Sequence, residues 1–165
     1  MAMDIHLDLT KGGINGESIE KGFEKQIQVL SWSWGASQSG SFATGEGGGS
    51  GKVSMQDFHF TQKMCTASPA ILLACSTGQH IDQAILTARK SGSKTTQQKF
   101  LVINFYNLLI SSYMTGGSDA SDGLPIESIS INYAKVDLEY FVQDSKGMVK
   151  SAGKNGYDLQ TNQPV

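Results

Sequence analysis

The sequence predicts a mainly β fold, an antiparallel β-barrel of two packed sheets with one flanking α-helix. Apolar and polar residues alternate along much of the chain, and this period of two is typical of half-buried strands. One segment, 68–76, has the start and stop signals of a helix. Composition agrees, because charged residues make up only 17% of the chain, against the usual ~25%, and 19 of the 165 residues are glycine.

The predicted strands are segments of alternating hydrophobicity separated by turn residues. They cover 4–9, 25–40, 52–62, 79–90, 99–112, 126–142 and 156–160. Within 126–142 the apolar positions change from odd to even numbers between Tyr133 and Val136. This change predicts a β-bulge or a kink near Ala134 and Lys135.

The long segment 25–40 places large apolar side chains on one face and serines, Ser31 and Ser33, on the other. Leaving two tryptophans in water would be costly, so the apolar face should point inward. The predicted core residues of this segment and the next strand are Leu30, Trp32, Trp34, Phe58 and Phe60. Ile27 and Val29 share the serine face, and we expect a neighbouring subunit to cover them.

The predicted helix begins with Ser68 as N-cap and Pro69 at the first helical position, and it ends at Gly78. The nearby Cys65 and Cys75 are the only cysteines. Without a secretory signal peptide at the N-terminus, they are predicted to be reduced packing residues.

Length and charge narrow the class of protein. A chain of 165 residues suits one domain, so we predict a single domain over 1–165. The net charge of −2 and the lack of a basic run argue against a nucleic-acid partner. No apolar run is long enough to span a bilayer, so membrane insertion is not expected.

Enzymatic motifs are not supported. The glycines of 45–51 resemble a phosphate-binding loop, but Glu46 and Val53 stand where that motif needs Gly and Ser or Thr. The three histidines, His6, His59 and His80, lack the close spacing of metal ligands. No Gly-x-Ser-x-Gly elbow is present to carry a nucleophilic serine. The sequence therefore predicts a protein without catalytic residues, metal or cofactor.

Several motifs occur together in a characteristic order. They are VLSWSWGASQSG at 29–40, GGGSGKVSMQD at 47–57, SPAILLACSTGQH at 68–80, AILTARK at 84–90, TGGS at 115–118, the strand 127–140 and GYDL at 156–159. This set resembles the haemolysin-coregulated protein (Hcp) family, the tube proteins of bacterial type VI secretion. Segments 11–23 and 143–155 do not fit the pattern of the family.

The resemblance implies a structural protein, not an enzyme. Six copies would form a ring, and rings would stack into a tube that a contractile sheath propels beneath a spike protein, with secreted effectors in its lumen. Such a protein is cytoplasmic before firing and is then secreted without a cleaved signal peptide. The alternative from a different class is a stand-alone β-barrel that binds a sugar or a small apolar ligand.

Two surfaces are predicted to serve the tube. Ser31 and Ser33 would face the lumen, where small hydroxyls leave space and offer adaptable hydrogen bonds to cargo. The glycine-rich stretch 41–51 is longer than the two to five residues usual for a hairpin loop, so we expect an arm that docks on another subunit. The residues assigned to this inter-subunit arm are Ser41, Phe42, Gly45, Gly47, Gly48, Gly49 and Gly51.

Overall fold

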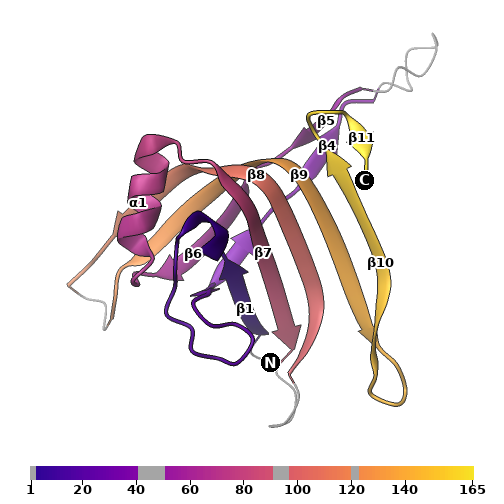
Figure 1. Cartoon of the computed structure of the whole chain (residues 1–165), viewed down its shortest axis with the longest axis horizontal. Coiled ribbons are helices and arrows are strands. Elements are labelled where there is room, and N and C mark those ends of the chain that lie inside the picture. The colour runs from indigo at the N-terminus through magenta and orange to yellow at the C-terminus, as the bar shows by residue number, and fades with distance from the viewer. Residues whose placement is uncertain (1–2, 41–50, 91–96, 120–122) are drawn as a thin grey trace.

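A computed structural model describes residues 3–40, 51–90, 97–119 and 123–165 (Figure 1). The strands are β1 (Met3–Asp8), β2 (Ile27–Gln28), β3 (Ser31–Ser33), β4 (Ala36–Gln38), β5 (Val53–Met55), β6 (Phe58–Lys63), β7 (Ile81–Lys90), β8 (Gln98–Gly116), β9 (Ile126–Gln143), β10 (Val149–Asp158) and β11 (Gln163–Pro164). A short 3-10 helix, η1 (Thr10–Gly12), follows β1, and the α-helix α1 (Ser68–Thr77) follows β6. The predicted mainly β class with one α-helix is confirmed.

The strands form one curled antiparallel sheet with a branch at β9. Its main order is β11-β10-β9-β8-β7-β1-β2. The first part of β9, residues 126–131, pairs with β6, whereas residues 135–143 pair with β10. Because β6 also pairs with β3, the sheet divides at β9 into a layer of β3, β6, β9 and β8 and a layer that continues through β7 and β1.

The two layers meet again at Val29 and Leu30. The amide of Val29 donates to the carbonyl oxygen of Ile5 in β1 at 2.9 Å, and the amide of Leu30 donates to that of Thr61 in β6 at 2.8 Å. The chain thus leaves one layer and joins the other within two residues. In the described residues the two layers are joined here by the continuous chain. No ladder of hydrogen bonds pairs β1 with β6, so strand pairing does not close a barrel at this point.

This change of layer corrects the prediction for Leu30. Its side chain is 46% exposed, so it lies outside the core. Ile27 and Val29 are buried within the subunit instead, and no neighbour is needed to cover them. Alternation restarts after the crossing, which leaves Trp32 and Trp34 half-buried against the core.

A kink accounts for the change of alternation in β9. Tyr133 and Val136 are both buried, as are the facing Phe105 and Leu108 of β8. The pairing register is the same on either side of this point, so no residue is inserted. Instead, Asn107 between the two β8 residues has φ 52°, a left-handed conformation that Asn tolerates better than most residues. The predicted irregularity is therefore a kink and not a bulge.

The core lies between the layers, and α1 packs against it. Its largest fully buried side chains include Leu7, Phe58, Phe60, Ile71, Leu86, Ile103 and Phe105. The N-cap of α1 is Ala67, not the predicted Ser68, and Gly78 ends the helix with φ 65° as expected. Cys65 and Cys75 are free thiols, half-buried against the core.

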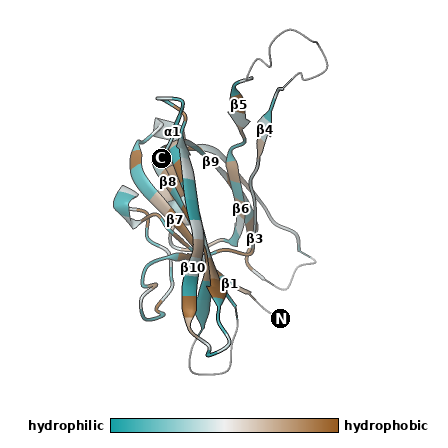
Figure 2. Ribbon diagram, turned by 90° about the vertical axis from the view of Figure 1, so that its right-hand side faces the viewer, coloured by the Kyte–Doolittle hydropathy of each residue, from teal (hydrophilic) through white to brown (hydrophobic). Residues whose placement is uncertain are grey.

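A separate two-stranded ladder, β4 with β5, projects from the body of the molecule (Figures 1 and 2). It continues the line of β3 and β6 beyond the sheet. All three residues of β4 are exposed.

Candidate functional site: a hydroxyl-lined sheet face

Small hydroxyl side chains line the face of the β3–β6–β9–β8 layer that points away from the core. Ser31 pairs with Thr61, their side-chain oxygens lie 2.6 Å apart, and Thr61 pairs in turn with Ser128. Ser31 and Ser33 are both exposed, opposite the half-buried Trp32. The structure thus places the two predicted serines side by side with other hydroxyls that come from two further strands.

The next row across the same face is a hydrogen-bonded chain. Ser33 pairs with His59, whose Nδ1 lies 2.6 Å from Oγ of Ser130. The hydroxyl of Ser112 in β8 donates to the same Ser130 oxygen at 2.7 Å. These contacts hold His59 on the polar face as a satisfied surface histidine.

Asp57 ends this polar face near the start of β6. Its two carboxylate oxygens accept hydrogen bonds from Ser111 at 2.7 Å and from Asn132 at 2.9 Å. The bulge in the β8–β9 ladder between Ile110 and Ser112 turns the Ser111 side chain toward it. The face as a whole therefore carries hydroxyl and amide groups with few charges.

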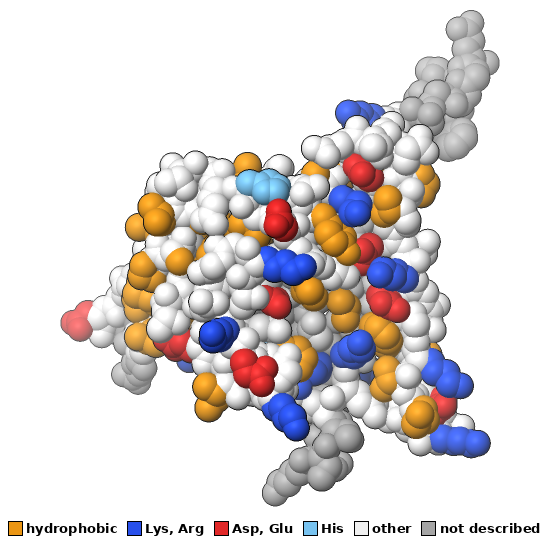
Figure 3. Space-filling view, viewed as in Figure 1, with side chains coloured by type: hydrophobic (Ala, Val, Ile, Leu, Met, Phe, Trp, Pro, Cys, Tyr) orange, Lys and Arg blue, Asp and Glu red, His pale blue; other side chains and the backbone are white. Residues whose placement is uncertain are grey.

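The outer face of the other layer differs in chemistry. Basic and acidic side chains intermingle over β7 to β10 (Figure 3). Asp137 accepts hydrogen bonds from Asn104 and Tyr106 and lies 3.9 Å from Nζ of Lys154. Burial, with Asp137 as a further cause, raises the pKa of Tyr106 to about 12. The hydroxyl-lined surface is thus a property of one layer only.

Aromatic side chains support the hydroxyl-lined face from beneath. Trp32 stacks on Phe58 with ring centroids 6.1 Å apart, and Phe58 contacts Phe105 at 4.8 Å. The indole of Trp34 donates to the hydroxyl of Tyr133, which donates to the carbonyl of Gln56 at 2.8 Å. Burial raises the pKa of Tyr133 to about 12.

A buried carboxylate joins this layer to the helix. Glu127 of β9 is fully buried and accepts hydrogen bonds from Gln62 at 2.7 Å, from the hydroxyl of Ser68 at 2.7 Å and from Tyr113. Burial raises the pKa of Tyr113 to about 12, and its hydrogen bond to Glu127 acts in the same direction. The three donors come from β6, α1 and β8, so Glu127 fixes all of them to one point.

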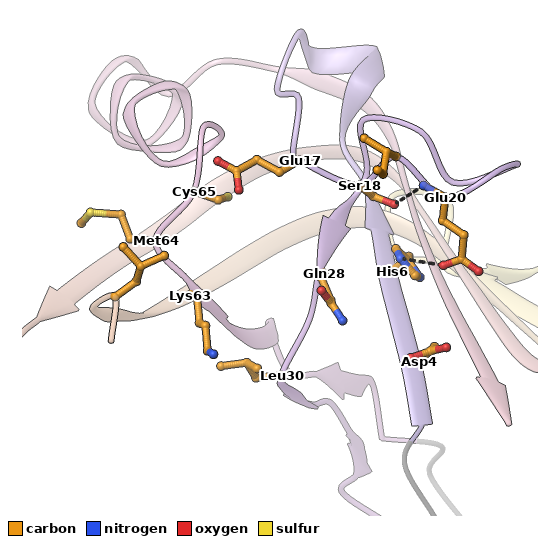
Figure 4. A pocket seen from close by; sticks show the side chains of 12 residues that line it. Asp4, His6, Glu17, Ser18, Glu20, Gln28, Leu30, Lys63, Met64 and Cys65 are labelled. Carbon is orange, nitrogen blue, oxygen red and sulfur yellow. Dashed lines mark hydrogen bonds and ion pairs between the residues drawn. The ribbon is translucent and has the colours of Figure 1, made fainter. Parts of the chain in front are cut away.

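A pocket of about 530 Å³ opens beside the crossing at Leu30 (Figure 4). It is lined by apolar side chains, among them Ile19 and Leu124, and by the carboxylates of Asp4, Glu17 and Glu20. The segment between η1 and β2, which carries Ile19, forms one wall.

One ion pair and one polar contact, both made by Glu20, hold that wall against β7 and β1. Glu20 accepts a hydrogen bond from Arg89 at 2.7 Å and lies 3.6 Å from Nε2 of the buried His6. The Phe23 ring lies 4.1 Å from the Arg89 guanidinium and 4.9 Å from the imidazole. Burial and then the Arg89 charge lower the pKa of His6, and the Arg89 hydrogen bond lowers the pKa of Glu20.

Comparisons with known proteins agree with this geometry. Residues 7–140 match the family model described as "Type VI secretion system effector, Hcp". "Protein hcp1" from Pseudomonas aeruginosa is 42% identical over 164 residues, covering 98% of each chain. The chain belongs to the Hcp family.

Solved structures share the fold over nearly the whole chain. "Structure of a type six secretion system protein" matches with a TM-score of 0.90 and 29% identity, covering 99% of this chain and 100% of the other. "Crystal structure of Hcp1 from Salmonella typhimurium" matches with a TM-score of 0.80 and 31% identity, covering both chains fully. The predicted resemblance is confirmed, and this is an Hcp protein of the type VI secretion system.

The predicted arm of this Hcp protein lies mostly outside the described residues, which include Gly51 but not Ser41, Phe42, Gly45, Gly47, Gly48 or Gly49. At Gly51 a Cβ atom would lie 1.7 Å from the backbone oxygen of Ser39. Only glycine permits so close an approach of the two sides of the β4–β5 hairpin.

Sequence reasoning missed the buried polar cluster, although a signal for it exists. Glu127 has the same odd register as the core residues Ile129 and Ile131, and Gln62 shares the register of Phe60. A polar residue at an apolar register position predicts a buried polar contact.

Other site types find no support in the ranges that the structure describes. No three His, Cys, Asp or Glu side chains gather there as metal ligands would. No helix in those ranges has the length and apolar character needed to cross a bilayer.

Proposed function

We propose that this Hcp protein is a structural, non-enzymatic subunit of the type VI secretion inner tube, folded as one barrel-like domain over 1–165. It assembles as hexameric rings that stack and carry effectors in the lumen. The number six rests on the family resemblance, as do the spike protein and the contractile sheath as partners. The protein is cytoplasmic before firing and is then secreted without a cleaved signal peptide.

The observation that carries this proposal is a pair of strand edges on opposite sides of the hydroxyl-lined layer. In the described residues β3 pairs only with β6, and β8 beyond Leu108 pairs only with β9. Exposed edges are ready templates for pairing with another chain. Pairing the β3 edge of one copy with the β8 edge of the next is a heterologous contact, which generates a ring when the rotation closes.

Such a ring would carry the hydroxyl-lined face around its inner wall. Ser31 and Ser33 would lie there with Thr61 and Ser128. Short hydroxyls occupy little volume and can donate or accept, so they suit cargo proteins of varied sequence. The inter-subunit arm 41–51 would leave the ring at the β4–β5 hairpin and contact another subunit.

The test is the native mass of the purified protein across micromolar concentrations, with negative-stain imaging for rings. A six-fold mass with ring-shaped particles supports the proposal. A monomeric mass throughout would overturn it and favour a binding module for a sugar or a small apolar ligand. Deleting 43–49 tests the arm separately, because it should leave the melting temperature of the subunit near that of the wild type and abolish stacks.

A further inference from the structure

Two facing residues of the hydroxyl-lined face keep unused hydrogen-bonding groups. Ser31 and Thr61 satisfy each other, with their side-chain oxygens 2.6 Å apart. Ser33 and His59 are both exposed and pair across the β3–β6 ladder, which brings their side chains together. Among the described residues, none forms a hydrogen bond with the Ser33 hydroxyl, and the imidazole of His59 is bonded through Nδ1 only. The Ser33 hydroxyl and Nε2 of His59 can therefore bind a group from outside the chain.

The contact with Ser130 decides which nitrogen of His59 carries the hydrogen. The hydroxyl of Ser112 donates to Oγ of Ser130 at 2.7 Å. The single hydrogen of the buried Ser130 hydroxyl is then available for Nδ1 of His59, which lies 2.6 Å away. A neutral imidazole that accepts at Nδ1 carries its hydrogen on Nε2. Ser112 and Ser130 are thus positioning residues, through which His59 presents a donor on the exposed side of the sheet.

We propose that Ser33 and His59 form a recognition site for the side-chain amides of Asn and Gln on a cargo protein. The inference rests on the proposed tube lumen and adds the chemistry that its wall recognises. Nε2 of His59 donates to the amide oxygen, and the Ser33 hydroxyl accepts from the amide nitrogen. Backbone amides of a folded cargo are mostly paired within the cargo itself, so side-chain amides are the accessible groups of this kind.

Charge favours a neutral ligand over an acidic or a basic one. Asp57 lies two residues before His59, about 7 Å along the chain, which is within the screening length of about 8 Å at physiological salt. Its carboxylate, held by Ser111 and Asn132, would repel a carboxylate on the cargo. The one lysine of β6, Lys63, lies at the far end of the strand and cannot offset this charge locally. A basic side chain fares no better at His59, because Nε2–H offers it no acceptor.

Fluorescent peptides of equal length test the selectivity. One alternates glycine with Gln, one glycine with Glu and one glycine with Ala, and fluorescence anisotropy measures their binding to purified rings at pH 8. We expect the Gln peptide to bind about ten-fold more tightly than the other two, because several sites around a ring can engage one chain. His59→Phe keeps an aromatic ring but removes the donor, and should reduce Gln-peptide binding several-fold, as should Ser33→Ala. His80→Phe, at an exposed position outside this face, is the matched control and should bind as the wild type does.

Nitrogen NMR of rings with labelled histidine tests the positioning role of Ser130. The wild type should show Nδ1 of His59 without a hydrogen, whereas Ser130→Ala should show both neutral forms and weaker Gln-peptide binding at an unchanged ring mass. Equal affinity for the Gln and Glu peptides, no binding of either, or undiminished binding to His59→Phe rings would overturn the recognition site and leave the proposed tube standing. Absence of rings in the parent protein would instead overturn the proposed function, and this inference with it.

Discussion

The hydroxyl of Ser68 donates a 2.7 Å hydrogen bond to the fully buried carboxylate of Glu127, which ties the first residue of α1 to the start of β9. The same hydroxyl accepts from the amide of Cys65 at 3.0 Å. One side chain thus fixes both the helix and the turn that leads into it. The helix position on the sheet therefore depends on a charged group in the core, which is stable only while all its donors are in place.

Replacing Glu127 should therefore destabilise the subunit strongly. Glu127→Leu leaves the buried donors of Gln62 and Ser68 and the half-buried hydroxyl of Tyr113 without their acceptor, and each unsatisfied buried group costs about 1–3 kcal/mol. Glu127→Gln, which retains one oxygen, should lose less. Urea unfolding measures both. Glu139→Leu on the same strand is the control, and equal losses at the two positions would contradict the role of the buried cluster.

Alkaline conditions should destabilise the fold through three tyrosines. Burial raises the pKa of Tyr106, Tyr113 and Tyr133 to about 12, from an ordinary value of 10.0. Between these values the unfolded chain releases phenol protons that the folded chain retains, so the free energy of unfolding falls as pH rises. The phenolate absorbance of the folded protein should therefore rise at a higher pH than that of the unfolded protein. Tyr133→Phe should remove part of this late change, and an unaltered late titration in that variant would contradict the assignment to Tyr133.

Acid should weaken the wall of the pocket. The pKa of His6 lies below its ordinary 6.5 because of burial and the Arg89 charge, so the unfolded chain binds a proton that the folded chain resists. Stability should fall as pH drops through 6.5, and again as pH drops below 4.5, where the unfolded chain binds a proton at Glu20 that the folded chain resists through the Arg89 hydrogen bond. Melting temperatures from pH 8 to 4 measure this. His6→Gln should flatten the upper part of the fall, whereas His80→Gln at an exposed site should not. Identical profiles for the two variants would contradict this account.

Leu30 and Phe58 are both core residues by the alternation of the sequence, but in the structure Leu30 is exposed and Phe58 is fully buried. Leu30→Ser should change the free energy of unfolding by about 0.5 kcal/mol or less, as is usual for surface positions. Phe58→Ala removes a fully buried ring that contacts Trp32, Phe60 and Phe105, and should cost about 3–5 kcal/mol. Chemical unfolding of the two variants measures the difference. A loss at Leu30 close to that at Phe58 would place Leu30 in the core after all.

Local pattern was sufficient for the helix and for most of the strands, because burial of one sheet face imposes a period of two wherever a strand stays in one layer. It missed the first part of β10, where the predicted strand covered only 156–160, because residues 150–155 are exposed on both faces and show no alternation. It failed at Leu30 because the chain changes layers there, and that depends on partners from β1 and β6, distant in sequence. The kink near Ala134 was visible because both sides of it are apolar, but its cause, the backbone of Asn107, lies on another strand. The contacts of Asp57 likewise join residues from β8 and β9 that no local pattern links.

The lumen assignment leads to a test at Ser33. Ser33→Gln places a longer side chain on an exposed position of the hydroxyl-lined face, so folding and ring assembly should be close to normal. In the proposed lumen, however, each ring would present six bulkier groups where cargo must fit, and retention of co-expressed effectors should fall several-fold. Co-purification of effectors with rings measures the effect. Ser151→Gln on the exposed surface of β10 is the matched control. If rings of the Ser33 variant retain every effector at the wild-type amount, this face does not line the cargo space. That conclusion holds for any number of subunits in the ring.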